Sequence, residues 1–215
     1  MTVPEDEDLP VAGTAVILRD GPAGPEALLL RRPDRGSFAG AWVFPGGKVE
    51  DVDRAVGGTE QEDARRAAIR ETAEEVGLRL SALAPLSCWS PPVEAPRRIR
   101  TWFFLAADPG GEVVVAADEV VEAGWFSPAA ALAAHDEGVI ALVPPTWRTL
   151  HGLRDAPSAD AALASAGRAE VFRTRIRRTA DGLIYFWDGD EFAGGPAGSR
   201  DRLVAESSLW RYERS

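Results

Sequence analysis

Residues 62–78 constrain the fold of this chain more than any other segment. They are rich in Ala, Arg and Glu, and a glycine follows the last apolar residue, so we expect a helix over residues 62–76. At 3.6 residues per turn, Glu71 and Glu75 lie one turn apart, and Glu74 flanks them. The same spacing gathers the apolar residues of the segment on the opposite side. The predicted helix therefore has one face for the protein core and one face of carboxylates.

Two interpretations fit the acidic face. Same-face glutamates repel each other by a few tenths of a kcal/mol per pair, which disfavours a helix built only for stability. A divalent cation would reverse this repulsion, and Mg²⁺ prefers carboxylate oxygens. Upstream, residues 44–48 read Phe-Pro-Gly-Gly-Lys, and glycines let a backbone approach a metal or a phosphate closely. Spacing alone leaves both a solvated charged face and a cation site open.

Together, the glycine turn and the helix resemble the Nudix box of the Nudix hydrolase superfamily. The family pattern is Gly, five residues, Glu, seven residues, then Arg-Glu-aliphatic-x-Glu-Glu-x-Gly-aliphatic. In this chain Glu62 and seven further residues precede Arg-Glu-Thr-Ala-Glu-Glu-Val-Gly-Leu at residues 70–78. Only Thr72 departs from this part of the pattern, where a bulky aliphatic residue is usual. The resemblance covers roughly residues 11–143.

A larger departure lies upstream of the helix. Fourteen residues, rather than five, separate Gly47 from Glu62. We interpret residues 50–60 as an acidic, flexible insertion, and a loop longer by this much costs only about 0.9 kcal/mol. The insertion leaves Glu50 and Asp51 as alternatives to Glu62 in the motif.

The resemblance implies an α/β fold, namely a Nudix-type α/β/α sandwich with a mixed sheet, followed by a C-terminal α+β extension. We expect a solvated tail over residues 1–10, the Nudix domain over residues 11–150 and the extension over residues 151–215. The apolar run at residues 183–187 needs to be covered. We therefore expect the extension to pack on the domain or to form a homodimer interface.

Residue by residue, the resemblance also implies the site. The metal ligands, for Mg²⁺ or Mn²⁺, are the Gly46 carbonyl, Glu71, Glu74 and Glu75. The residues that shape the motif are Gly47, Glu62, Arg70 and Gly77, with Arg70 paired to Glu62 or Glu74. The catalytic residues are Glu71, Glu74 and Glu119, and a solvated loop acid is the alternative interpretation of Glu119. Glu119 is the preferred general base because it precedes the strand that closes the domain.

Substrate binding needs cations despite the acidity of the chain. The candidates flank predicted strand ends near the glycine turn: Arg31, Arg32, Arg97 and Arg98. Arginine suits bidentate phosphate contacts, although solvation of a strand end explains such residues equally well. Trp42 is a candidate for stacking a base, and a place in the core is its alternative.

The implied reaction is metal-dependent hydrolysis of a diphosphate bond in a nucleoside diphosphate linked to another moiety. Residues 96–104 and 144–148 are weakly similar to the branch with coenzyme A diphosphatases, so coenzyme A or a derivative and ADP-ribose are candidate substrates. One alternative is a Nudix-fold regulator or sensor that binds a nucleotide without turnover. Another is an isoprenoid diphosphate isomerase, which needs a Cys and Glu pair, and the lone Cys88 has no evident partner.

Composition bounds the partners and the location. The 215 residues carry 34 acids and 24 bases, a formal net charge of −10, which disfavours binding to nucleic acid. The sequence has no run of about 18 apolar residues, so we expect no membrane span. A single cysteine fits a reducing compartment, and we expect a cytoplasmic protein.

Overall fold

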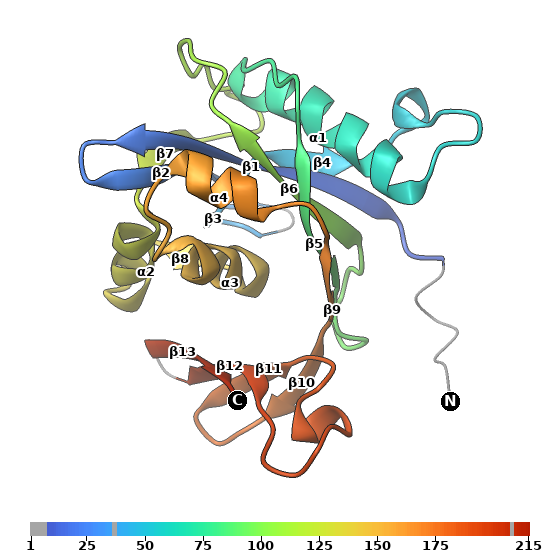
Figure 1. Cartoon of the computed structure of the whole chain (residues 1–215), viewed down its shortest axis with the longest axis vertical. Coiled ribbons are helices and arrows are strands. Elements are labelled where there is room, and N and C mark those ends of the chain that lie inside the picture. The colour runs from blue at the N-terminus through green and yellow to red at the C-terminus, as the bar shows by residue number, and fades with distance from the viewer. Residues whose placement is uncertain (1–7, 36–37, 207–208) are drawn as a thin grey trace.

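The computed structural model describes residues 8–35, 38–206 and 209–215 (Figure 1). Within these ranges a large sheet has the strand order β8-β3-β2-β1-β6-β5-β9, while β4 pairs with β1 and β7 pairs with β2. Its strands are β1 (Val11–Gly21), β2 (Gly24–Arg31), β3 (Ala41–Val43), β4 (Gly46–Lys48), β5 (Ala84–Ser90), β6 (Arg100–Ala107), β7 (Glu122–Phe126), β8 (Ala141–Leu142) and β9 (Glu170–Arg173). Strand β1 runs parallel to β6 and antiparallel to β2, so the predicted mixed sheet is confirmed.

Helices cover both faces of this main sheet. Figure 1 shows α1 (Glu60–Val76) on one face and α2 (Pro128–Asp136), α3 (Pro144–Leu153) and α4 (Ala159–Ser165) on the other. Side chains alternate along β1 and β2, so Ile17 and Leu28 pack under α1, whereas Val16 and Leu29 face the other helices. The predicted α/β/α sandwich is therefore confirmed.

Helix α1 lies unusually close to β1 because small residues meet at the contact. A Cβ atom on Gly13 would lie 1.7 Å from the carbonyl oxygen of Ala64. Thr59 caps the first turn, and Gly77, in the left-handed conformation (φ +73°), ends the helix. The helix thus ends at Val76 as predicted and begins two residues earlier than predicted.

A second, antiparallel sheet follows the main one along the chain. It consists of β10 (Arg175–Arg178), β11 (Gly182–Phe186), β12 (Asp201–Glu206) and β13 (Leu209–Arg214), in that order. Strand β9 leads into this sheet and is itself an edge strand of the main sheet, parallel to β5. The C-terminal segment therefore contributes to both sheets.

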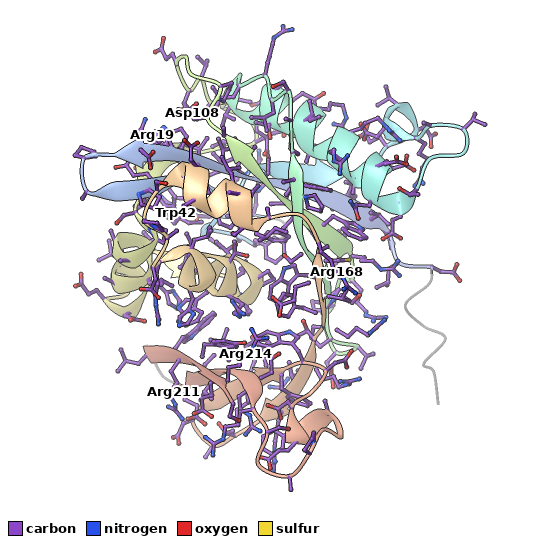
Figure 2. All side chains as sticks on the ribbon, in the orientation of Figure 1. Arg19, Trp42, Asp108, Arg168, Arg211 and Arg214 are labelled. Carbon is purple, nitrogen blue, oxygen red and sulfur yellow. The ribbon has the colours of Figure 1, made fainter. Side chains whose placement is uncertain are left out.

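Aromatic side chains fill the space between the two sheets (Figure 2). Trp89 of β5 stacks on Phe172 of β9 with ring centroids 4.0 Å apart, and Trp187 meets both rings edge-on. On α3, the guanidinium of Arg148 lies 4.2 Å from the ring of Tyr212. Of the apolar run at residues 183–187, Phe186 and Trp187 are buried within this chain, and the other three residues are partly exposed.

None of the helices in the described ranges combines the length and the apolar composition needed to cross a bilayer.

Candidate functional site

Three carboxylates meet at the C-terminal half of α1. Glu71, Glu75 and Glu119 each offer an oxygen, and these oxygens lie within 4.8 Å of one another. Glu71 and Glu75 are one helical turn apart on α1, and Glu119 comes from the loop between β6 and β7. We call this group the carboxylate cluster.

Hydrogen bonds to the end of α1 bring Glu119 into the cluster. The last carbonyl groups of a helix have no partner within it, and the β6–β7 loop supplies two. The N–H of Val114 donates to the Val76 carbonyl (3.0 Å), and the N–H of Ala116 donates to the Glu75 carbonyl (2.9 Å). The N–H of Val121 donates to the Arg31 carbonyl at the far end of the loop. The loop is therefore fixed on both sides of Glu119.

Glu75 is the buried member of the cluster, with 1% of the residue exposed. One carboxylate oxygen accepts a hydrogen bond from Nη1 of Arg32 (2.6 Å), and the other accepts one from the N–H of Gly46 (2.9 Å). Burial raises the pKa of Glu75 to about 7, although Gly46 and Arg32 act in the opposite direction. Burial also raises the pKa of Glu71. These carboxylates sit where a cation would stabilise their charged forms.

The glycine turn makes room for the cluster. A Cβ atom on Gly47 would lie 2.1 Å from the carboxylate carbon of Glu71, so any side chain there would displace this carboxylate. Gly46 has a φ of +154°, and a Cβ atom on it would lie 2.3 Å from the Gly13 carbonyl oxygen. Position 46 therefore requires glycine for its close approach to β1, whereas glycine at position 47 leaves the Glu71 carboxylate in its place.

Arg70 holds the helix, the insertion and the turn together. Its Nε and Nη2 donate to the two carboxylate oxygens of Asp53 at 3.1 and 2.8 Å, and Nη2 also donates to the Lys48 carbonyl. Its Nη1 donates to Glu71 and to Glu74, each at 2.9 Å. Burial acts to raise the pKa of Asp53, but the hydrogen bonds from Arg70 and the Glu50 N–H keep it below its ordinary value.

The predicted pairing of Arg70 with Glu62 is replaced by pairing with Asp53. The Glu62 carboxylate instead accepts hydrogen bonds from the N–H and the hydroxyl of Thr59, in the capping box of α1. Asp53, 3% exposed, follows Gly47 after five residues, which is the family spacing with Asp in place of Glu. The extra residues of the insertion lie after this acid, between Asp53 and α1, rather than before it.

Glu74 and the other predicted ligand, Gly46, lie at the margin of the cluster. Glu74 has a side chain that is 54% exposed and pairs with Arg70, the other predicted partner of that arginine. It is not brought within the group that Glu71, Glu75 and Glu119 form. Gly46 contributes its N–H to Glu75, as described above.

The predicted substrate-binding residues separate into three places. Arg32 follows β2 and contacts Glu75, while its neighbour Arg31 lines a cavity of about 780 Å³. Trp42 also lines this cavity, but it is 7% exposed and packs edge-on against Phe126, as expected of a core residue. Arg97 and Arg98 lie elsewhere, in the loop between β5 and β6, where Nη2 of Arg98 donates to the Pro91 carbonyl.

Cys88 has the environment of a structural cysteine. It is buried on β5, and burial raises the pKa of its thiol to about 12. The nucleophilic thiolate is therefore scarce near neutral pH. This disfavours the isomerase alternative, which needs a reactive cysteine.

Residues 9–143 match the family model of the NUDIX domain. The crystal structure of a NUDIX hydrolase from Alicyclobacillus acidocaldarius is similar over 76% of this chain and 99% of that one, with 24% identity and a TM-score of 0.67. A MutT NUDIX hydrolase from Burkholderia pseudomallei is similar over 67% and 98%, with 28% identity and a TM-score of 0.52. The NUDIX domain of Shewanella oneidensis NrtR, complexed with ADP ribose, is similar over 72% and 92%, with 15% identity and a TM-score of 0.54. No curated protein sequence matches this chain.

Proposed function

The chain belongs to the Nudix family, and from this premise we propose that it hydrolyses a nucleoside diphosphate linked to another moiety, with a divalent cation held at the carboxylate cluster. The chain is a Nudix pyrophosphohydrolase, so diphosphate hydrolysis is its activity. The proposal adds the metal, the roles of individual residues and the substrate class, with coenzyme A or a derivative and ADP-ribose as candidates. The convergence of Glu71, Glu75 and Glu119 is the observation that carries it.

The cluster fits a hard divalent cation. Its donors are carboxylate oxygens, which suit Mg²⁺ and Mn²⁺, and the space beside Glu71 exists because position 47 has no side chain. Bound there, Mg²⁺ or Mn²⁺ would neutralise the diphosphate and make water a better nucleophile. We propose Glu71 and Glu75 as the residues that hold the cation, with Glu74 and the Gly46 carbonyl as outer ligands and Glu119 beside them as the base.

We propose that the side chains around the cluster position the water and the substrate. We propose that a water oxygen attacks one phosphorus, that the bond from this phosphorus to the bridging oxygen breaks, and that Glu119 accepts the proton from water. Glu119 suits this role because it is exposed and held against the cluster by its loop. Arg70 keeps Glu71 in place, and Arg32 offers a guanidinium beside Glu75 for the phosphate charge.

A hydrolysis screen tests the proposal. The purified chain is incubated with coenzyme A, an acyl-coenzyme A, ADP-ribose and a dinucleoside polyphosphate, with Mg²⁺, with Mn²⁺ or with excess chelator, and products are identified by mass. We expect cleavage at the diphosphate only when a metal is present. The pair 3′,5′-ADP and phosphopantetheine would identify coenzyme A as the substrate. Binding without any cleavage would instead support the sensor alternative.

Glu119→Gln tests the assignment of the base. The amide keeps the size of the side chain but cannot accept the proton, so we expect kcat to fall about 100-fold or more at pH 7. An unchanged kcat would move the role of base to Glu71 or Glu74.

A further inference from the structure

The 780 Å³ cavity opens on the face of the main sheet that α2 and α3 cover, away from α1. Three large aromatic residues line it, together with glycine and aliphatic residues: Trp42 comes from β3, Phe126 from β7 and Trp210 from β13. Figure 2 labels Trp42 on this side of the sheet. Trp210 packs against His135 of α2, with ring centroids 4.5 Å apart. The C-terminal sheet therefore completes a cavity whose other walls belong to the Nudix domain.

Two opposite charges stand side by side in the wall of this cavity. Arg31 of β2 and Glu122 of β7 are direct cross-strand partners, and both line the cavity. A guanidinium only donates hydrogen bonds, and a carboxylate only accepts them. The cavity thus offers aromatic surface together with one donor group and one acceptor group.

The cavity adjoins the carboxylate cluster at the end of β2. Arg31 faces the cavity, whereas the next residue, Arg32, contacts Glu75, because side chains alternate between the two faces of an extended chain. The loop that carries Glu119 is bonded to the Arg31 carbonyl through the N–H of Val121. The cavity and the cluster are therefore linked through consecutive residues at the end of β2, one on each face of the sheet.

We propose that this cavity binds the nucleobase of the diphosphate substrate and that Trp210 of the C-terminal sheet is a specificity-determining residue of the hydrolase. The inference rests on the proposed function, because it names the group at one end of the same substrate. A nucleobase has a flat face that stacks on aromatic rings, and an edge that both accepts and donates hydrogen bonds. Because Glu122 offsets the charge of Arg31, this wall offers no net positive charge to hold a diphosphate, whereas a neutral base can use both groups.

Binding measurements without turnover test this inference. The probes are AMP, GMP, CMP and UMP, with inorganic pyrophosphate as the probe without a base, all titrated calorimetrically into the full chain with Mg²⁺. We expect Trp210→Ala to raise the Kd of the tightest nucleotide about 5- to 150-fold, the range expected when one base–aromatic stack is lost. Trp210→Phe should keep most of the affinity, and the Kd of pyrophosphate should not change.

Two further variants keep the test decisive. Leu209→Ala is the matched control, because Leu209 is the neighbour of Trp210 on β13 and is 65% exposed; it should leave every Kd unchanged. Glu122→Gln changes an exposed side chain and should alter the order of the Kd values of the four nucleotides. This variant tests the cavity even if Trp210→Ala does not fold.

The outcomes separate this inference from the proposed function. Equal nucleotide affinity in wild type and folded Trp210→Ala would overturn the inference, as would no binding of any of the four nucleotides or an unchanged ranking in Glu122→Gln. If the wild type hydrolysed no diphosphate, the proposed function would fail. Nucleotide binding that still depended on Trp210 would then leave the cavity assignment standing.

Discussion

The carboxylate cluster and the interface beneath the C-terminal sheet are built in opposite ways. The cluster draws on α1 and the β6–β7 loop, and charged pairs surround it, such as Arg32 with Glu75 and Arg70 with Asp53. The interface joins rings far apart in the sequence, from Trp89 to Tyr212. Its buried arginine, Arg148, faces the rings of Phe172 and Tyr212.

This difference indicates that the interface contributes mainly to stability and the cluster mainly to activity. A carboxylate buried at a raised pKa, as Glu75 is, weakens the fold, which is a cost expected of the metal site that we propose. The rings at the centre of the interface, such as Trp89, Phe172 and Trp187, stabilise the fold and do not contact the cluster. Substitutions in the interface should therefore change stability first, whereas substitutions in the cluster should change turnover first.

The largest effect is expected from Trp187→Ala in the interface. Trp187 is 1% exposed, packs against Phe172, and its Nε1 donates to the Thr174 hydroxyl. We expect the free energy of unfolding in urea to fall by about 3–5 kcal/mol, the usual loss for a large buried ring. Trp125→Ala is the control, because Trp125 is only partly buried, under Arg19. Equal losses in the two variants would contradict the central place of Trp187.

Glu75→Gln should have the largest effect on turnover. The amide can still accept the hydrogen bond from the Gly46 N–H, but it removes a negative ligand, so we expect kcat to fall about 100- to 1,000-fold. Thermal unfolding without metal should show a Tm that is unchanged or higher, because a buried charge is gone. Glu74→Gln, at the margin of the cluster, should lose less than about tenfold. Equal losses would place Glu74 among the primary ligands.

The sequence predicts the carboxylate cluster better than it predicts the aromatic interface. The end of α1 and the place of Glu71 and Glu75 on one face could be read from helical spacing, which is local. The role of Asp53 does not follow from the helix motif, because Glu62 already stands seven residues before Arg70; the spacing of five residues after Gly47 is the signal that indicates Asp53. The interface could not be predicted, because its rings meet through tertiary packing and follow no shared period.

A comparison of Asp53→Asn with Glu62→Gln tests whether Asp53, rather than Glu62, anchors Arg70. Asp53→Asn weakens the anchor of Arg70, which holds Glu71, so we expect activity to fall about 10- to 100-fold, as for other residues that orient metal ligands. Glu62→Gln should leave activity unchanged and lower the Tm slightly, since it affects only the capping box. Kinetics at saturating Mg²⁺ and a Mg²⁺ titration provide the comparison. A greater loss of activity in Glu62→Gln than in Asp53→Asn would indicate that Arg70 pairs with Glu62.

The smallest predicted effect is a pH dependence of the interface. His151 of α3 stacks on Trp147 and meets the Tyr212 ring edge-on. Burial, reinforced by the charges of Arg154 and Arg148, lowers the pKa of His151 to about 4 from 6.5, while Asp155 opposes this shift. Since the unfolded chain takes up the proton first, this residue contributes stability above pH 6.5 that is lost as the pH falls through about 4.

His151→Gln should remove that contribution, so the difference in Tm between wild type and variant should shrink from pH 7.5 to pH 4.5. The comparison isolates one group, because the carboxyl groups, including Glu75 with its opposite trend, titrate in both proteins. His135, whose pKa burial also lowers, remains in the variant and leaves part of the acid sensitivity in place. Parallel Tm curves would show that His151 gains its proton equally in the folded and unfolded chains, and that the interface opens to solvent well before the domain unfolds.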